Sequence, residues 1–159
     1  MSELHELLKA RFAMVRQDLE GVLARLSDAD MSWAPREGMR TVSGQFVEIA
    51  IKEKEVLTWI RRGEWVDEDA EAFEEQNSTI QVMRATLNSI RVETLAYIDS
   101  LSESELQEPI SSPERWWEAL RLTECPRSEI LRNVAAHEWY HTGQLVSYLW
   151  MRGEDPESW

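Results

Sequence analysis

The sequence predicts an all-α protein, a four-helix bundle that occupies residues 1–159 as a single domain. The first observation is periodicity: apolar residues recur at three- and four-residue spacing in four long stretches, the period of an amphipathic helix. The second is length, because 159 residues suffice for one domain with its own core. The third is connectivity, since two shorter connections and one long connection join these stretches, as in helix bundles. No alternating pattern predicts a strand.

The first two predicted helices flank a turn-rich segment. The first begins near the N-terminus and carries an almost strict apolar heptad: Leu4, Leu8, Phe12, Val15, Leu19, Val22 and Leu26. Residues 27–40 contain Pro35 and Gly38 and are predicted to be turns. The second helix is expected from about Thr41 to Arg62, with one apolar stripe: Val42, Phe46, Ile49, Val56 and Ile60. Residues 63–76 are acidic and without period, so we expect them to be irregular.

The third and fourth predicted helices flank the long connection. Asn77 or Ser78 is expected to cap the third helix, whose apolar stripe consists of Ile80, Met83, Leu87, Ile90, Tyr97 and Leu101. Residues 102–126 contain three prolines and are predicted to be a long connection with a short helix around residues 114–120. Ser128 and Glu129 open the fourth helix, which is expected to reach about Arg152.

The charge balance limits the classes of partner. The chain has 17 basic and 30 acidic residues and a formal net charge of −13. This excess opposes binding to nucleic acid or to an anionic membrane, because a phosphate-binding surface needs clustered lysines and arginines. The one cysteine, Cys125, cannot form an internal disulfide, which suits a reducing cytoplasm. The sequence shows neither a secretory signal nor an apolar stretch long enough to span a membrane.

Two histidines interrupt the core-facing stripe of the fourth helix. On a helical wheel, His137 and His141 lie on the same face as Ile130, Val134 and Tyr148. Two imidazoles one turn apart can converge on one metal ion. Inward histidines without a partner would lose their hydration, so an ion, a water or a hydrogen-bond partner is required. A pair of hydrogen-bonded core histidines is the alternative, and for two such residues we favour metal binding.

The segment from His137 to His141 also matches the HExxH motif of zinc proteases. In that interpretation Glu138 is a general base that activates a metal-bound water. Three features oppose a protease: 18 residues follow His141, Gln144 and Ser147 stand where the longer motif needs glycine and histidine, and no strand is predicted beside the site. Glu138 therefore remains a candidate catalytic base, an orienting residue or a buried structural carboxylate.

A third ligand must come from upstream. His5 lies near the N-terminus and is expected to be a solvated surface residue. The second helix offers three carboxylates, Glu48, Glu53 and Glu55. On its wheel Glu53 lies near the middle of the apolar stripe and Glu48 at its edge. Periodicity alone prefers Glu53 and leaves the choice open.

Three segments together resemble the DinB/YfiT-like family of small metal-binding four-helix bundle proteins. The segment at residues 137–145 reads HEWYHTGQL, which is similar to the HExxHxGQ sequence on that family's final long helix. The segment at residues 41–50, TVSGQFVEIA, looks like the family's second-helix motif, and residues 33–38 look like its preceding turn. In order and spacing, the resemblance covers nearly the whole chain.

The resemblance implies a metal site with Glu48, His137 and His141 as ligands. The family's second-helix motif usually supplies a histidine just before an apolar–Ala pair, and here that position is Glu48. Two histidines and one carboxylate suit Zn²⁺, and they favour Mn²⁺, Fe²⁺ or Ni²⁺ more than three histidines would. The family's frequent arginine after the second histidine is Thr142 here, so no anion contact is expected from it. Asn133, one turn before His137, is a candidate hydrogen-bond donor behind the ligands.

The resemblance further implies a metal-dependent enzyme that acts on a small molecule, either a hydrolase or a thiol S-transferase. The transferases of the family use low-molecular-weight thiols such as bacillithiol or mycothiol, and a metal ion with an open position acidifies a water or a thiol. Glu138 is the candidate catalytic residue. The cleft is expected beside the metal, lined by Trp59 and roofed by residues 64–75 and by Trp116 and Trp117.

A homodimer is implied by the resemblance and by Trp150 and Trp159, which look exposed. The alternative to an enzyme is a non-catalytic metal-binding or structural dimer of a stress response, which Glu48 and the missing arginine support. A site that has lost its metal is a further alternative. The sequence names neither the metal nor the substrate.

Overall fold

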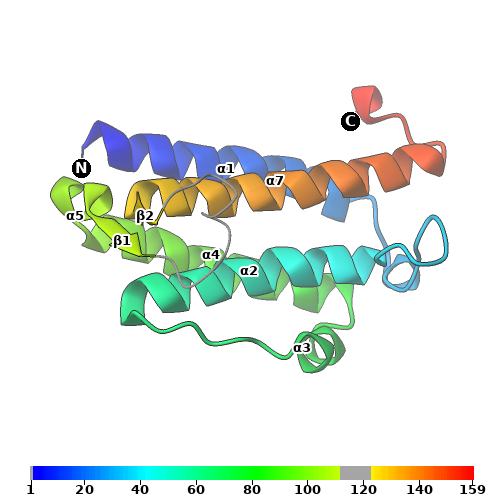
Figure 1. The fold of residues 1–159 in the computed structure, drawn as a ribbon. Coiled ribbons are helices and arrows are strands. Elements are labelled where there is room, and N and C mark those ends of the chain that lie inside the picture. Colours follow the sequence, from blue (N-terminus) through cyan, green and yellow to red (C-terminus); the bar gives the residue numbers. More distant parts are fainter. Residues whose placement is uncertain (1, 112–122) are drawn as a thin grey trace.

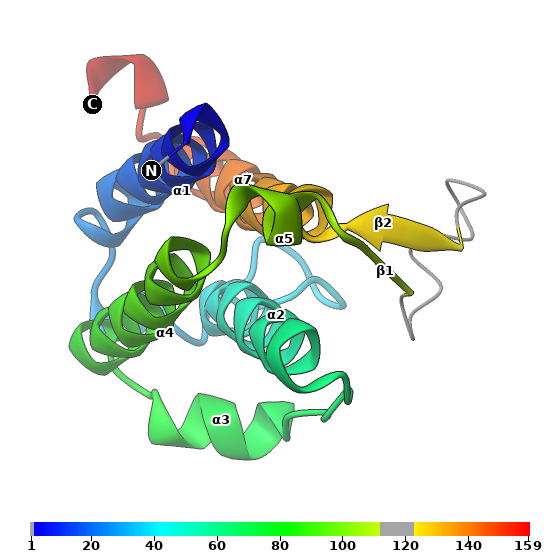
Figure 2. The ribbon, with the colours of Figure 1, turned by 90° about the vertical axis from the view of Figure 1, so that its left-hand side faces the viewer.

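Four long helices carry the fold: α1 (Glu3–Leu23), α2 (Val42–Arg62), α4 (Ile80–Ser100) and α7 (Arg127–Met151). The structure is a computed structural model that describes residues 2–111 and 123–159. Each long helix contacts two neighbours, so that α1, α7, α2 and α4 surround one core (Figure 2). The predicted all-α bundle is thus confirmed. Among the described residues, no helix is long and apolar enough to cross a membrane.

The four helices do not alternate in direction. The helices α1 and α7 run side by side in one direction, and α2 and α4 run in the other (Figure 1). Because α2 and α4 are parallel, the chain must return along the whole bundle between them. Residues 63–79 make this return, which explains the long acidic segment between the second and third predicted helices.

Local chemistry sets the helix ends close to their predicted positions. The Thr41 hydroxyl accepts a hydrogen bond from the Gly44 amide at 3.0 Å and caps α2. Gly63 ends the same helix with a φ of 73°, a left-handed conformation that glycine adopts without strain. The helix α4 is capped by Thr79 rather than by Asn77 or Ser78.

The connections contain short elements that the sequence analysis did not predict. The acidic segment includes α3 (Ala70–Gln76), whose one buried side chain is Phe73. The long connection includes α5 (Glu103–Gln107) and a two-stranded antiparallel sheet of β1 (Pro109–Ser111) and β2 (Glu124–Pro126). Elements of three to seven residues are too short to show a period. The predicted helix at residues 114–120 lies outside the described residues. Two 3₁₀ turns, Asp28–Asp30 and Pro156–Ser158, complete the fold.

A layer of four buried charges divides the core into two apolar clusters. One cluster contains Leu19, Phe46, Met83, Leu87 and Leu145 among its members, and the other contains Leu8, Phe12, Val56, Ile98 and Ile130. Between them, each long helix contributes one charged side chain: Arg16, Glu53, Arg91 and Glu138. The two arginines and two glutamates balance in charge and pair with one another, which offsets part of the cost of burying them.

His5 is buried, contrary to the expectation of a solvated surface residue. Its Nε2 atom lies 2.9 Å from the backbone oxygen of Leu101, and its Nδ1 atom lies 2.8 Å from the Ser2 hydroxyl. The first turn of α1 packs against the end of α4, a long-range contact that local sequence does not reveal.

Candidate metal centre

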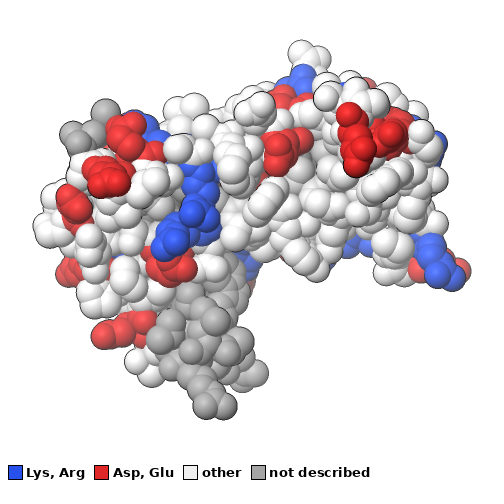
Figure 3. Space-filling view, turned by 90° about the horizontal axis from the view of Figure 1, so that it is seen from above, with Lys and Arg blue, Asp and Glu red and all other residues white. Residues whose placement is uncertain are grey.

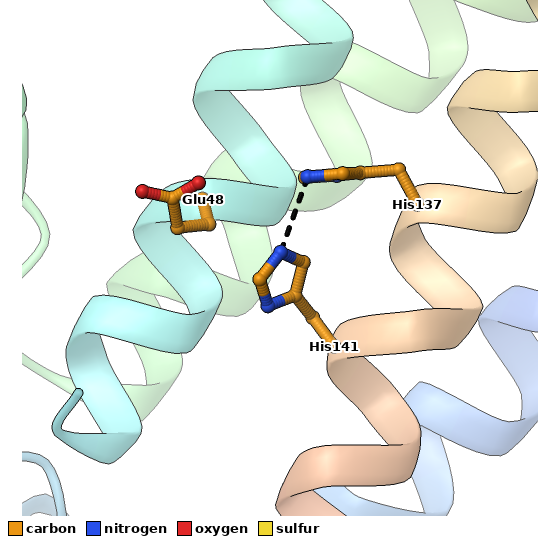
Figure 4. Close-up of side chains that lie close together, drawn as sticks. All are labelled: Glu48, His137 and His141. Atoms are coloured by element: carbon orange, nitrogen blue, oxygen red, sulfur yellow. Dashed lines mark hydrogen bonds between the residues drawn. The ribbon is translucent and has the colours of Figure 1, made fainter. Parts of the chain in front are cut away.

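The structure brings Glu48 of α2 together with His137 and His141 of α7. One ligand atom from each residue lies within 4.8 Å of the others. Both imidazole rings extend from α7 toward Glu48 across the space between the two helices (Figure 4). The two histidine Nε2 atoms are 3.1 Å apart. Among the described residues, this is the one group of three or more His, Cys, Asp or Glu side chains arranged for a metal ion.

The two helices place these side chains by their period and their packing. His137 and His141 lie one turn apart on the face of α7 that packs against α2. His141 is 3% exposed. Glu48 lies at the edge of the buried face of α2, and its side chain is 35% exposed. The cluster therefore lies at the rim of the bundle, where a small molecule can reach it.

Burial keeps both histidines in their neutral form. Loss of hydration is the main cause that lowers the pKa of His137 to about 3, and the electrostatic effects of His141, Lys52 and Arg40 act in the same direction. Burial also lowers the pKa of His141, against an opposing effect of the Glu48 carboxylate. A neutral imidazole has a nitrogen lone pair, the form in which histidine binds a metal ion.

Gln45 determines which nitrogen of His141 carries the proton. The backbone oxygen of Arg40 can only accept, so the Tyr148 hydroxyl donates to it at 3.0 Å. The hydroxyl oxygen in turn accepts from the Gln45 amide nitrogen at 3.0 Å. The Gln45 amide oxygen thus faces His141 and accepts a hydrogen bond from its Nδ1–H at 2.6 Å. The Nε2 lone pair of His141 is therefore directed toward the cluster, as in metal-ligating histidines.

The donor set and its spacing fit a divalent transition ion. In a tetrahedral site with nitrogen ligands at about 2.0–2.1 Å, two such nitrogens lie about 3.3 Å apart. Without an ion, the Nε2–H of His137 donates a hydrogen bond to the Nε2 atom of His141, as the dashed line in Figure 4 marks. The 3.1 Å between these atoms is close to the spacing that a shared ion would require. Two imidazoles and one carboxylate suit Zn²⁺, Ni²⁺, Mn²⁺ or Fe²⁺ and leave coordination positions for other ligands.

Arg40 is the cationic partner of Glu48. Its Nη2 atom lies 2.7 Å from the Glu48 Oε1 atom. Arg40 belongs to the segment before α2, for which the sequence analysis predicted turns and no role. Neither Arg40 nor Gln45 was identified from the sequence, although Gln45 lies one turn before Glu48 in the second-helix motif that was quoted for the resemblance.

The other two carboxylates of α2 have different partners. Glu53, which periodicity preferred, is buried, and its carboxylate accepts two hydrogen bonds from Arg91 at 2.9 and 3.0 Å. Glu55 accepts a hydrogen bond from the Glu68 amide at 3.0 Å. Periodicity correctly predicted that Glu53 points inward, but its partner is an arginine and not the histidine pair.

Glu138 lies in the buried charge layer and not in the cluster. Its side chain is 1% exposed, and Arg16 donates to both of its oxygens at 3.0 and 3.1 Å. Arg91 donates a further short hydrogen bond to it. A carboxylate engaged in this way has little capacity left to take a proton from a metal-bound water. The geometry supports the structural interpretation of Glu138, and its catalytic role remains a prediction without structural support.

Three other residues of the sequence hypothesis have their contacts outside the cluster. The Asn133 side chain donates to the backbone oxygen of Glu129. The Thr142 hydroxyl donates to the backbone oxygen of Glu138 at 2.8 Å. Trp59 is buried in the apolar cluster of Phe12 and Ile130. Trp116 and Trp117 lie outside the described residues.

A family model and solved structures agree with this fold. The model of the DinB superfamily matches residues 11–145. A DinB-like protein of Bacillus subtilis has 17% identity and a TM-score of 0.69, with 94% of each chain covered. A protein of Streptococcus pneumoniae has 22% identity and a TM-score of 0.71, with 93% of this chain and 91% of that chain covered.

A more distant structural likeness is to an enzyme. A mutant of a mycothiol-dependent maleylpyruvate isomerase has 18% identity and a TM-score of 0.58, and the match covers 91% of this chain and 63% of that chain. In sequence, the chain matches no curated protein.

Proposed function

Because the chain belongs to the DinB superfamily, we propose that it is a metal-dependent enzyme that acts on a small molecule, as a thiol S-transferase or a hydrolase. The observation that carries this proposal is the cluster of Glu48, His137 and His141. Both histidines are neutral, and Gln45 directs the lone pair of His141 toward the cluster. Buried histidines with these properties are prepared for a metal ion.

The chain's own residues would hold the ion at the rim of the bundle. His137 and His141 would bind through Nε2 and Glu48 through a carboxylate oxygen. A divalent ion held there supplies a Lewis acid that lowers the pKa of a bound water or thiol. The structural likeness to a mycothiol-dependent isomerase supports the thiol alternative. Among the described residues, neither Glu53 nor Glu138 is free to act as a general base at the cluster, because each carboxylate is paired with arginines.

A second candidate function is a non-catalytic metal-binding or structural dimer. The ion pair between Arg40 and Glu48 favours it, because the guanidinium competes with a metal ion for the carboxylate. A site of this kind would bind a metal ion weakly and would not catalyse a reaction.

We also propose that the protein is a homodimer. Several large apolar side chains of α1 and α7 are exposed, namely Leu7, Met14, Trp139, Tyr140, Trp150 and Met151. Figure 3 shows this face from above, with uncharged residues over most of its centre. Trp159 is also exposed, at 37%, and it contacts Arg25, whose guanidinium carbon lies 4.3 Å from the ring centroid. Exposed aromatic residues are typical of interfaces.

A cytoplasmic location, expected from the single cysteine, stays a prediction.

A screen of turnover would test the enzymatic proposal. The metal-loaded protein would be incubated with small electrophiles and either bacillithiol, mycothiol or glutathione, and separately with activated esters and amides. We expect metal-dependent loss of one electrophile or ester, which His137→Ala abolishes. Full metal occupancy without any turnover would overturn the enzymatic proposal and favour the non-catalytic dimer.

A further inference from the structure

A cavity of about 350 Å³ lies beside the candidate metal centre. It is formed by the end of the segment before α2, the first turn of α2 and the second half of α7. Its lining residues are Met39, Arg40, Gln45, Gln144, Ser147, Tyr148 and Met151. None of these belongs to residues 64–75, which the sequence analysis expected to roof the cleft. The cavity is of a size that accommodates a small molecule.

Two of the lining residues also contact the metal cluster. Arg40 pairs with Glu48, and Gln45 accepts the hydrogen bond of His141. A molecule in this cavity would therefore have one end beside the metal ligands.

The cavity combines apolar walls with one positive charge. Met39, Tyr148 and Met151 supply apolar surface, and Arg40 is the one charged residue among the described lining residues. The side chain of Arg40 is 52% exposed, so a ligand can reach its guanidinium. A guanidinium has five N–H donors and binds carboxylates through two parallel hydrogen bonds. One cation in an otherwise uncharged lining matches a ligand with a single negative charge.

Metal binding would release Arg40 from its present partner. A divalent ion on Glu48 draws on the same carboxylate charge that now holds the guanidinium, and the two cations repel each other. The pairing of Arg40 with Glu48 would therefore weaken as the ion binds. The guanidinium would then need another anion, and the adjoining cavity is where one can lie.

We propose that the substrate is a small monocarboxylate, whose carboxylate binds Arg40 and whose apolar body lies against Met39, Tyr148 and Met151. This inference rests on the proposed function, because it identifies the substrate class of the same site. Arg40 acts here as a specificity-determining residue. Arg40 also couples the binding of the metal ion to the binding of the carboxylate. Each ligand increases the affinity for the other, because both favour the state in which Arg40 and Glu48 are apart.

Direct binding measurements with hexanoate test this proposal without any need for turnover. The zinc-loaded protein would be titrated by calorimetry with hexanoate and with hexanamide, a neutral molecule of almost the same shape. We expect hexanoate to bind at least about tenfold more tightly than hexanamide, as charge-assisted hydrogen bonds would provide. The metal-free protein should bind hexanoate more weakly than the zinc-loaded protein, because Glu48 then occupies Arg40.

Two arginine variants distinguish binding of the carboxylate by Arg40 from its direct binding to the metal ion. Arg40→Gln should lose the preference for hexanoate over hexanamide, whereas Arg36→Gln, an exposed arginine in the same segment, should keep it. Arg40→Gln should also bind zinc at least as tightly as the wild type, because Glu48 no longer has a competing partner. Equal binding of hexanoate and hexanamide to the wild type, or an unchanged preference in Arg40→Gln, would overturn the proposal. Failure of the proposed function would appear differently, as absent turnover with this binding preference intact.

Discussion

The Nδ1 atom of His141 lies 2.6 Å from the amide oxygen of Gln45, on a chain of hydrogen bonds that ends at the backbone oxygen of Arg40. Removal of the Gln45 amide would leave the His141 ring free to adopt the other tautomer. We predict that Gln45→Leu weakens zinc binding by about 10–100-fold, the usual effect of losing a partner behind a metal-bound histidine. Competition with a chromophoric zinc chelator would measure this change.

The control for this prediction is Gln107→Leu, a substitution of an exposed glutamine in α5. It should leave the zinc affinity unchanged. Equal zinc affinities of Gln45→Leu and the wild type would show that Gln45 does not prepare His141 for a metal ion.

The buried charge layer yields a prediction about stability. Glu138 pairs with Arg16 and Arg91, and its removal would leave two buried guanidinium groups with fewer partners. Glu138→Ala should lower the free energy of unfolding by about 3–5 kcal/mol. Glu129→Ala removes a 42% exposed carboxylate of the same helix that pairs with Arg132, and it should cost less than about 1 kcal/mol. Urea denaturation would measure both, and similar losses in the two variants would contradict this structural role.

The low pKa of His137 predicts how acid affects the metal-free protein. Its pKa is about 3 in the folded state, compared with an ordinary value of 6.5. Between these values the unfolded chain binds a proton that the folded protein does not. The contribution of His137 to stability is therefore complete above about pH 6.5 and is lost as the pH falls toward 3.

Comparison with His137→Gln isolates this contribution, because glutamine does not titrate. The free energy of unfolding of the wild type should decrease more steeply than that of His137→Gln as the pH falls from 7 to 5. Parallel pH profiles for the two metal-free proteins would mean that His137 titrates in the folded state as it does in the unfolded chain.

The exposed face of α7 predicts self-association. Trp150 is 59% exposed, and we expect it to be buried between two copies of the chain. Sedimentation velocity should show a dimer at micromolar concentration, and Trp150→Ser should raise its dissociation constant at least tenfold. Val92→Ser, which changes a 66% exposed residue of α4, should leave the dimer intact. A wild-type protein that stays monomeric would contradict the proposed dimer.

The long helices were predictable because each has a stripe of apolar residues with a helical period. Short elements were not, since α3 has one buried side chain, Phe73, and each strand has only three residues. His5 shows the same limitation: its burial depends on Leu101, which is 96 residues away in the sequence.

The candidate site was predictable in part for a related reason. Periodicity placed His137 and His141 on the inner face of α7, where the structure has them. It preferred Glu53 over Glu48, because a wheel identifies the buried face but not the partner on another helix. Arg91 of α4 binds Glu53, whereas Glu48 lies beside the histidines. The roles of Arg40 and Gln45 depend on their contacts with Glu48 and His141, which the local sequence pattern does not predict.

The metal content of the protein, purified without a histidine tag and equilibrated with a divalent transition metal, tests the central claim most directly. Elemental analysis should find about one ion per chain in the wild type and in Glu37→Ala, a control in the exposed segment before α2. Glu48→Ala and His137→Ala should lose most of it, because each removes one of three ligands. A wild type without bound metal, or a Glu48→Ala protein with full occupancy, would contradict the account.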